Sequence, residues 1–287
     1  MPNRTQTLMI EQLHHHRPQG PNLLRESLLG RGFLAFANGD GVSLGSGSHQ
    51  DDLRVLEQIP GLHVRRLVND RDRVAAISLG PGSDGLDVAT RILSLGEHHV
   101  GDRYGGFTGY GPGPRVSECW TTYTQMVWGA KLAVCPARAP HQRRVPNALD
   151  AGIGLLVKVL PLGRIASSLS CDGHGTRPAH VSFHFPFDVP WARTVFGALG
   201  PADPAVEWSW GDGGVSIQPR EGFEDDAVIC MLKDIQTRAR RLLDRQIIEA
   251  IGRARRALLD EFGDDGPTLN AFTVAAERVI ERELGAR

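Results

Sequence analysis

The sequence contains few cysteines, no long hydrophobic run and almost no net charge, and each lack excludes a class of protein. Four cysteines among 287 residues are too few for a disulfide scaffold. No apolar run reaches the roughly 18 to 20 residues of a membrane-spanning helix, and no N-terminal stretch has the pattern of a signal peptide. The formal net charge of −1 provides no overall field that would attract nucleic acid or a membrane. We therefore expect a cytoplasmic protein with no membrane partner, in which only a local basic patch would bind nucleic acid.

Several common functional motifs are missing as well. The glycine-rich segment 39–48 lacks the Gly-Lys-Ser/Thr end of a phosphate-binding loop. The chain has no His-Glu-x-x-His sequence and no paired Cys-x-x-Cys sequence. We also see no internal repeat. Function must therefore be argued from a local group of side chains.

Hydrophobic patterns predict an α+β fold, with a mixed or antiparallel sheet, packed helices and a helical C-terminal region. Residues 1–145 are interpreted as an N-terminal α/β region with a glycine-rich loop at 101–114. Residues 146–218 are interpreted as a central helix–strand–turn–strand unit. Residues 219–287 form the helical region, whose amphipathic stripe suits a homo- or hetero-oligomer contact.

Individual helices and strands are predicted from the period of the hydrophobic pattern and from the glycine, proline and capping residues at its ends. The predicted strands are 32–38, 63–69, 73–79, 165–169, 179–185, and a hairpin of 206–210 with 215–218. The predicted helices are 86–95 after an Asp84 cap, one that begins at an Asn147 or Asp150 cap and runs to about residue 160, 190–199, 224–262 and 269–284. We expect a solvated terminus over residues 1–22 and a loop over 38–48, and residues 224–262 form either one long helix or two helices with a break near Gly252.

The chain is organised around a turn that carries reactive side chains between two predicted strands. Its sequence, residues 170–175, is Ser-Cys-Asp-Gly-His-Gly. Glycine tolerates backbone angles that other residues avoid, so the turn can be tight. Cys171 and His174 can then project to the same side, as two metal ligands or as a thiol and its base.

Two kinds of metal site fit this turn. In the first, Cys171 and His174 bind zinc together with Cys119 and Cys135, and four protein ligands make the site structural. In the second, Cys171, His174 and a strand histidine such as His184 hold the ion. That arrangement leaves one coordination position for water, which would permit hydrolysis.

Two alternatives need no metal. A histidine could activate Cys171 as a nucleophile, which gives a cysteine-dependent enzyme. The turn could also be a packed turn without chemistry, because its composition is common in turns and cysteine often fills space in cores.

Our functional hypothesis is a metal-dependent hydrolase, with zinc as the expected ion, acting on a phosphorylated or nucleotide-like small molecule. Cys171, Asp172 and His174 are the expected catalytic residues. The expected substrate-binding residues are Tyr104, Tyr110, Arg143 and Arg144. The alternative is a non-catalytic subunit, in which the turn holds a structural zinc or only packs and the C-terminal helices bind a partner.

The turn also resembles a motif of a known family. A helix, a strand and then Ser170-Cys171-x-Gly173 is similar to the motif of the tRNA wybutosine-synthesising protein 3 family of methyltransferases. The likeness covers only residues 150–175, and His174 stands where that family has a basic arginine. A resemblance confined to one turn implies no activity for the whole chain.

Overall fold

The fold is α+β, with two four-stranded antiparallel sheets and helices packed against them. The computed structural model describes residues 2–16, 18–39, 41–45, 50–67, 73–96, 101–102, 147–200, 203–223, 227–263 and 266–285. The α+β class predicted from the sequence is confirmed. Within the described part of the chain, no helix is long and apolar enough to cross a bilayer.

The N-terminal elements build the first sheet. They are α1 (Arg4–His16), α2 (Pro21–Arg31), β1 (Ala35–Asn38), β2 (Gly41–Gly45), α3 (Gln50–Glu57), β3 (Leu62–Arg66), β4 (Arg73–Leu79), α4 (Gly85–Leu93) and β5 (Gly101–Asp102). The strand order is β1-β2-β4-β3. β5 pairs instead with β6 (Asn147–Ala148), which leads into the second half.

The second half builds the second sheet and ends in helices. Its elements are α6 (Ala151–Val159), the 3-10 turn η2 (Leu160–Gly163), β7 (Ser167–Cys171), the 3-10 turn η3 (Gly173–Gly175), β8 (Ala179–Phe183), α7 (Asp188–Ala198), β9 (Val206–Gly211), β10 (Gly214–Pro219), α8 (Ala227–Arg241), α9 (Arg245–Phe262) and α10 (Leu269–Leu284). The strand order is β7-β8-β10-β9.

The two halves repeat one architecture. Elements α2 to α4 and elements α6 to α8 both run helix, two strands, helix, two strands, helix, and the two sheets have the same strand order. The strand registers align Val42-Ser43-Leu44 with Val181-Ser182-Phe183. The closing helices share an Asp-x-x-Thr-Arg sequence, at residues 87–91 and at residues 234–238. The described part of the chain therefore contains an internal structural repeat, which we call the duplication and which corrects the reading of the sequence as free of repeats.

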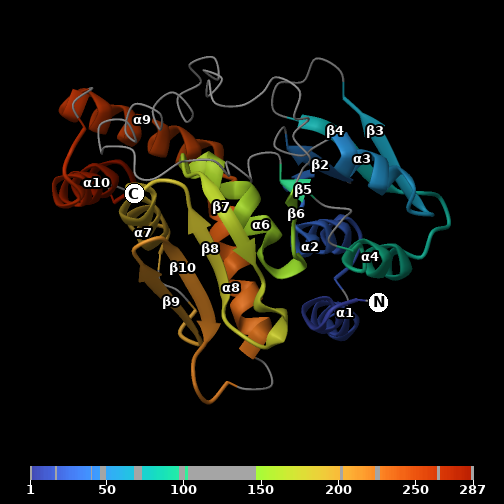
Figure 1. Ribbon diagram of the computed structural model, residues 1–287. Coiled ribbons are helices and arrows are strands. Elements are labelled where there is room, and N and C mark those ends of the chain that lie inside the picture. Colours follow the sequence, from blue (N-terminus) through green and yellow to red (C-terminus); the bar gives the residue numbers. More distant parts are fainter. Residues whose placement is uncertain are drawn as a thin grey trace, which may run out of the picture.

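The halves meet along α2 and α6, which lie side by side in the middle of Figure 1 with a sheet on either side. Gly32 has φ of 105°, and a Cβ there would lie 3.0 Å from the backbone carbonyl carbon of Gly154. Glycine is thus required on conformational and steric grounds. A buried ion pair of 2.7 Å between Lys158 on α6 and Asp52 on α3 also crosses the junction. The halves share one continuous hydrophobic core.

Three sequence expectations differ from the structure. Residues 4–16 form a helix rather than a solvated terminus, because Met9 and Leu13 are buried against the core. Residues 41–45 form a central strand rather than a loop. The long C-terminal helix breaks before Asp244 and not at Gly252, since the Asp244 carboxylate caps α9 by accepting hydrogen bonds from two backbone amides.

Candidate metal centre

The connection between β7 and β8 has an unusual backbone. Gly173, His174 and Gly175 all have positive φ, of 78°, 51° and 72°. A left-handed conformation costs a residue with a side chain roughly 1 to 2 kcal/mol. Such strain tends to occur where function needs a particular side-chain direction. The turn therefore holds the imidazole of His174 in a direction that a relaxed backbone would not provide.

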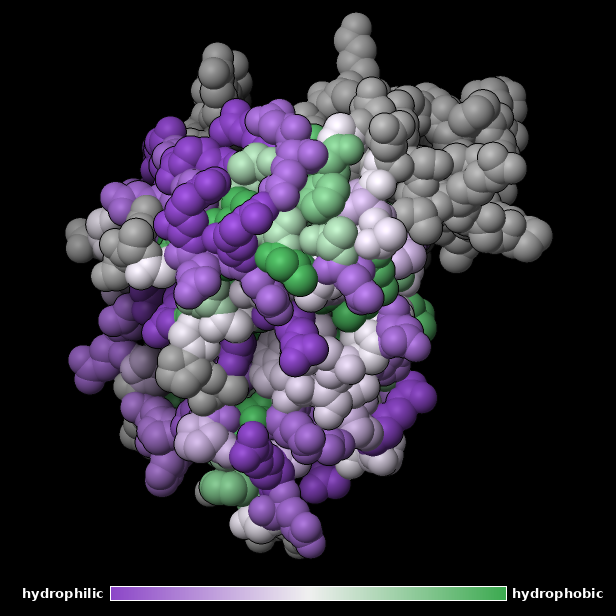
Figure 2. Space-filling view, turned by 90° about the vertical axis from the view of Figure 1, so that its left-hand side faces the viewer, coloured by the Kyte–Doolittle hydropathy of each residue, from purple (hydrophilic) through white to green (hydrophobic). Residues whose placement is uncertain are grey.

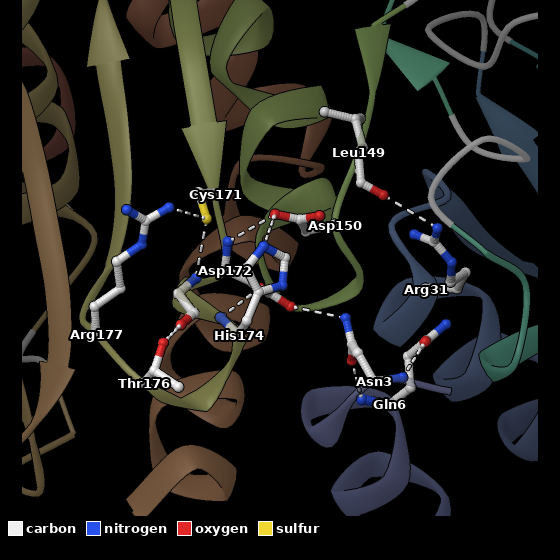
Figure 3. A network of polar contacts seen from close by, with 11 residues as sticks. Asn3, Gln6, Arg31, Leu149, Asp150, Cys171, Asp172, His174, Thr176 and Arg177 are labelled. Atoms are coloured by element: carbon white, nitrogen blue, oxygen red, sulfur yellow. Dashed lines mark hydrogen bonds and ion pairs between the residues drawn. The ribbon is translucent and has the colours of Figure 1, made fainter. Parts of the chain in front are cut away.

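Four potential ligand residues gather at this turn. Asp150, Cys171, Asp172 and His174 each offer one ligand atom, and these atoms all lie within 4.8 Å of one another. Figure 3 shows the side chains converging from the end of β7, the turn after it and the residue before α6. The structure thus brings together the three turn residues predicted from the sequence and adds Asp150.

Asp172 orients the imidazole of His174. Its Oδ1 atom lies 3.0 Å from Nδ1 of His174 and also accepts the backbone N–H of His174 at 2.9 Å. The Asp172 side chain is fully buried, whereas that of His174 is 45% exposed. In a neutral imidazole, a proton on Nδ1 leaves the lone pair on Nε2. Nε2 lies 3.9 Å from Oδ2 of Asp150, so its free electron pair is available beside a carboxylate.

Asp150 is held in place by both halves of the chain. Its Oδ2 atom accepts the backbone N–H of Asp172 at 3.0 Å, which ties the residue before α6 to the turn. The preceding carbonyl, that of Leu149, accepts a hydrogen bond of 3.1 Å from the buried guanidinium of Arg31 on α2. Figure 3 shows this contact entering from the first half. The duplication junction therefore positions one of the four potential ligand residues.

The sulfur of Cys171 acts as a hydrogen-bond acceptor. It receives the backbone N–H of Gly173 at 3.4 Å and Nη2 of Arg177 at 3.3 Å. A thiolate that binds a metal commonly accepts hydrogen bonds from N–H groups of this kind. Cys171 is buried, while Arg177 is exposed to solvent on the other side of the sulfur.

The donor set fits a transition-metal ion. Zinc binds carboxylate oxygen, thiolate sulfur and imidazole nitrogen at about 2.0 to 2.3 Å, which separates tetrahedral ligand atoms by about 3.3 to 3.8 Å. Ligand atoms within 4.8 Å of one another need only small side-chain rotations to reach that spacing. Asp172 would then be the carboxylate that orients the histidine ligand, a common partner in metal sites. The group could therefore bind a metal ion.

His184 does not belong to this group. Cys171 pairs with His180 across the two strands, whereas Ser167, at the other end of β7, pairs with Phe183. The backbone N–H of His184 bonds to the carbonyl of Ala166, so His184 lies about four residues along the strand from Cys171. At about 3.3 Å per residue, that distance excludes a shared ion.

The remaining predicted site residues lie outside the described residues. They are Tyr104, Tyr110, Cys119, Cys135, Arg143 and Arg144. Their part in a closed zinc set or in substrate binding stays a prediction.

Two site residues were missed by sequence reasoning. Asp150 was interpreted only as a helix cap, and the structure gives it no capping hydrogen bond. Its carboxylate instead accepts the hydrogen bond from the backbone of the turn. Arg177 carried no signal in the sequence, because its contact with Cys171 depends on how the loop folds back.

A serine motif of hydrolases was also overlooked, and the structure excludes it. Residues 41–45 have the spacing Gly-x-Ser-x-Gly. A nucleophilic serine of that motif lies on a sharp, exposed turn between strand and helix. Ser43 is instead fully buried in β2, paired with Phe36 on one side and Ala76 on the other. It cannot reach a substrate.

The duplication indicates how the turn differs from a simple connection. In the first half, residues 39–40 suffice to join β1 to β2, with Asn38 paired to Gly41. In the second half, the equivalent strands are joined by residues 172–178. A hairpin does not need those additional residues. They include Asp172, His174 and Arg177.

No protein-family model, curated protein or solved structure matches the chain. The likeness of the turn to the tRNA-modifying methyltransferase family therefore gains no support, and the function has to be inferred from the site itself.

Proposed function

We propose that the chain is a metal-dependent hydrolase whose ion is held by Asp150, Cys171 and His174, with zinc as the ion. The observation that carries the proposal is the mixed oxygen, sulfur and nitrogen set gathered within 4.8 Å on an extended hairpin connection. This revises the ligand set expected from the sequence, because Asp150 takes the place of a strand histidine.

The proposed site is an open one. Three protein ligands leave a fourth position, and zinc bound in that way activates a water molecule at neutral pH. His174 is half-exposed, so a substrate can approach from its side. The Asp172 carboxylate keeps the imidazole oriented, and Arg177 contributes a positive charge beside the sulfur. That charge suits an anionic substrate such as a phosphate ester.

Metal binding is the first test of this proposal. Protein made without a purification tag and stripped with chelator is expected to bind one equivalent of zinc per chain. Replacement by Co²⁺ should produce a thiolate-to-cobalt absorption band. Cys171→Ser should abolish the band, and His174→Ala should abolish tight binding of either ion. Cys230→Ser, which changes the half-buried thiol on α8, should leave both unchanged.

A further control tests whether zinc binds adventitiously to the histidines near the N-terminus. His14, His15 and His16 end α1 and could bind zinc on their own. A triple alanine variant at these positions is expected to retain the single equivalent. If this variant loses zinc while Cys171→Ser retains it, the proposed centre does not exist.

Hydrolysis is tested on the same proteins. The zinc-loaded chain should release nitrophenol from p-nitrophenyl phosphate or its diester, and the Cys171→Ser and His174→Ala variants should not. If zinc binds with the expected ligands but no phosphate ester is cleaved, the site is structural and the hydrolase proposal fails.

Changing Asp172 to Asn tests its part as the orienting carboxylate. Asparagine keeps an oxygen that can accept the backbone N–H of His174, but it removes the negative charge next to Nδ1. Removing such a partner typically weakens metal binding by about 10- to 100-fold. We expect that loss in a competition titration against a chromophoric chelator. Unchanged affinity would mean that Asp172 only shapes the turn.

A second function is favoured by the surface of α10. Leu269 and Val274 on this helix are 46% and 64% exposed. Figure 2 shows hydrophobic side chains gathered in the upper part of a face that is otherwise largely hydrophilic. We propose that the C-terminal helices, which include α10, bind a partner if the metal centre proves structural, which keeps the non-catalytic alternative.

A further inference from the structure

The outer face of the second sheet carries a hollow that begins beside the metal centre. Its volume is about 520 Å³. It is lined by parts of β8, β9 and β10 and, at the end nearest the turn, by Arg177. The guanidinium of Arg177 also donates to the sulfur of Cys171, so this residue belongs to both the hollow and the centre.

A row of polar side chains runs from the centre across the sheet. Cys171 pairs with His180, His180 with Ser216, and Ser216 with Ser209. Side chains directly opposite one another in antiparallel strands lie on the same face. The row therefore crosses all four strands on the outer face, with a thiol, an imidazole and two hydroxyls in succession.

The neighbouring row of paired residues on this face carries no bulky side chain on β9 and β10, because it contains two glycines. In that row Ser182 pairs with Gly214, and Gly214 pairs with Gly211. A Cβ at Gly214 would lie 2.1 Å from the carbonyl oxygen of Val181, whereas one at Gly211 would meet nothing within 4 Å. Close strand packing thus explains the first glycine, while the second leaves open space above the sheet. The floor of the hollow is backbone and small side chains.

The charged side chains that line the hollow indicate which kind of ligand it would bind. Among the described residues that line it, Arg177 is the one charged group, and the nearest carboxylate that bonds to a lining side chain is that of Glu207, at its edge, 3.5 Å from Oγ of Ser209. The corresponding hollow on the first sheet has a volume of about 610 Å³ and is lined by both Arg65 and Glu57. The hydrogen bond from Arg66 lowers the pKa of Glu57, so that hollow carries a carboxylate. The duplication has therefore produced two hollows of different electrostatic character.

We propose that the second-sheet hollow is the subsite that holds the phosphate group of the substrate. Arginine offers a forked pair of N–H donors that matches phosphate oxygens. His180 and the hydroxyl of Ser216 supply further donors along the row, and the Ser209 hydroxyl can join them by turning from Glu207, to which it donates at 3.5 Å. This inference rests on the proposed function, because it assigns the substrate-binding half of the same site. It commits to a small phosphate ester, with its phosphate on the sheet and its reacting bond toward His174.

Inorganic phosphate is the probe for this subsite. Chelator-treated, isotope-labelled full-length protein is titrated with phosphate at constant ionic strength and followed by NMR. Backbone resonances of Ser209, Gly214 and Ser216, all from lining residues, should shift together and saturate. We expect a Kd of about 1 mM, which is reasonable for a single anion without the rest of the substrate.

The Arg177→Ala variant should weaken phosphate binding about tenfold, and Arg177→Lys should recover part of the loss because the positive charge returns. The matched control is Arg220→Ala, which removes an exposed arginine just after β10 that does not line the hollow. An equal loss in both alanine variants, or shifts scattered outside the hollow, would overturn the subsite.

The two proposals fail separately. Phosphate is titrated without metal, so a missing phosphate response with intact zinc binding removes only the subsite. Zinc binding that survives Cys171→Ser, together with a normal phosphate response, removes only the metal centre.

Discussion

Replacing Lys158 with Met is expected to lower the free energy of unfolding by about 3 to 5 kcal/mol. The Lys158 ammonium lies 2.7 Å from the Asp52 carboxylate, and the two side chains are only 2% and 1% exposed. It also lies 4.9 Å from the centre of the Phe33 ring. Methionine keeps the length of the side chain and removes its charge. The buried carboxylate would then lose its charged partner at the junction of the two halves.

The control for this prediction is the double variant Lys158→Met with Asp52→Leu. Replacing a whole buried ion pair with apolar residues is often neutral or stabilising, because the cost of desolvating both charges disappears. We therefore expect the double variant to regain most of the stability in urea unfolding. If the single variant loses less than about 1 kcal/mol, the pair does not hold the halves together.

Elements with strong local signals were predicted correctly from the sequence. Asp84 caps α4 by accepting the backbone N–H of Leu86 at 2.9 Å, as predicted. The glycine-rich turn at 211–214 closes the hairpin of β9 and β10, with Gly211 paired to Gly214. In both cases the residues that decide the structure are neighbours in the chain, so the sequence is sufficient.

Elements that depend on tertiary packing were not predicted. Strand β2 is rich in glycine and serine and resembles a loop, yet it is held between β1 and β4 by pairing on both sides. The duplication was hidden for a related reason. What the halves share is strand order and register, whereas few identities remain and the connection between the first two strands differs in length.

The candidate site likewise has one part that the sequence predicts and another that depends on tertiary packing. Cys171, Asp172 and His174 lie on one turn, so their proximity follows from chain connectivity. Asp150 joins them only because α6 begins beside the end of β7, and Arg177 because the loop folds back on the sulfur. The sequence could therefore predict the turn as the place where potential ligands gather, but not the full set of side chains around it.

Changing Asp234 to Ala is expected to cost about 3 to 5 kcal/mol of unfolding free energy. The Asp234 carboxylate accepts hydrogen bonds from Nε1 of Trp208 at 2.5 Å, from the backbone N–H of Asp203 at 3.0 Å and from Nε of Arg238 at 3.0 Å. The Asp234 side chain is 2% exposed and that of Arg238 is 9% exposed. Alanine removes the charged partner of a buried guanidinium, which keeps only its bond to the Phe196 carbonyl, and it leaves two N–H donors without their acceptor.

The duplication supplies the matched control for this change. Asp87 and Arg91 occupy the same positions of the shared sequence on α4, with a contact of 2.8 Å, but their side chains are 54% and 50% exposed. An exposed pair of this kind contributes at most about 1 kcal/mol, including the favourable charge at the helix start. Asp87→Ala should therefore change the urea midpoint little, while Asp234→Ala lowers it strongly. Equal losses would mean that burial does not distinguish the two pairs, and a small loss in both would mean that α8 is held to the second sheet by apolar packing alone.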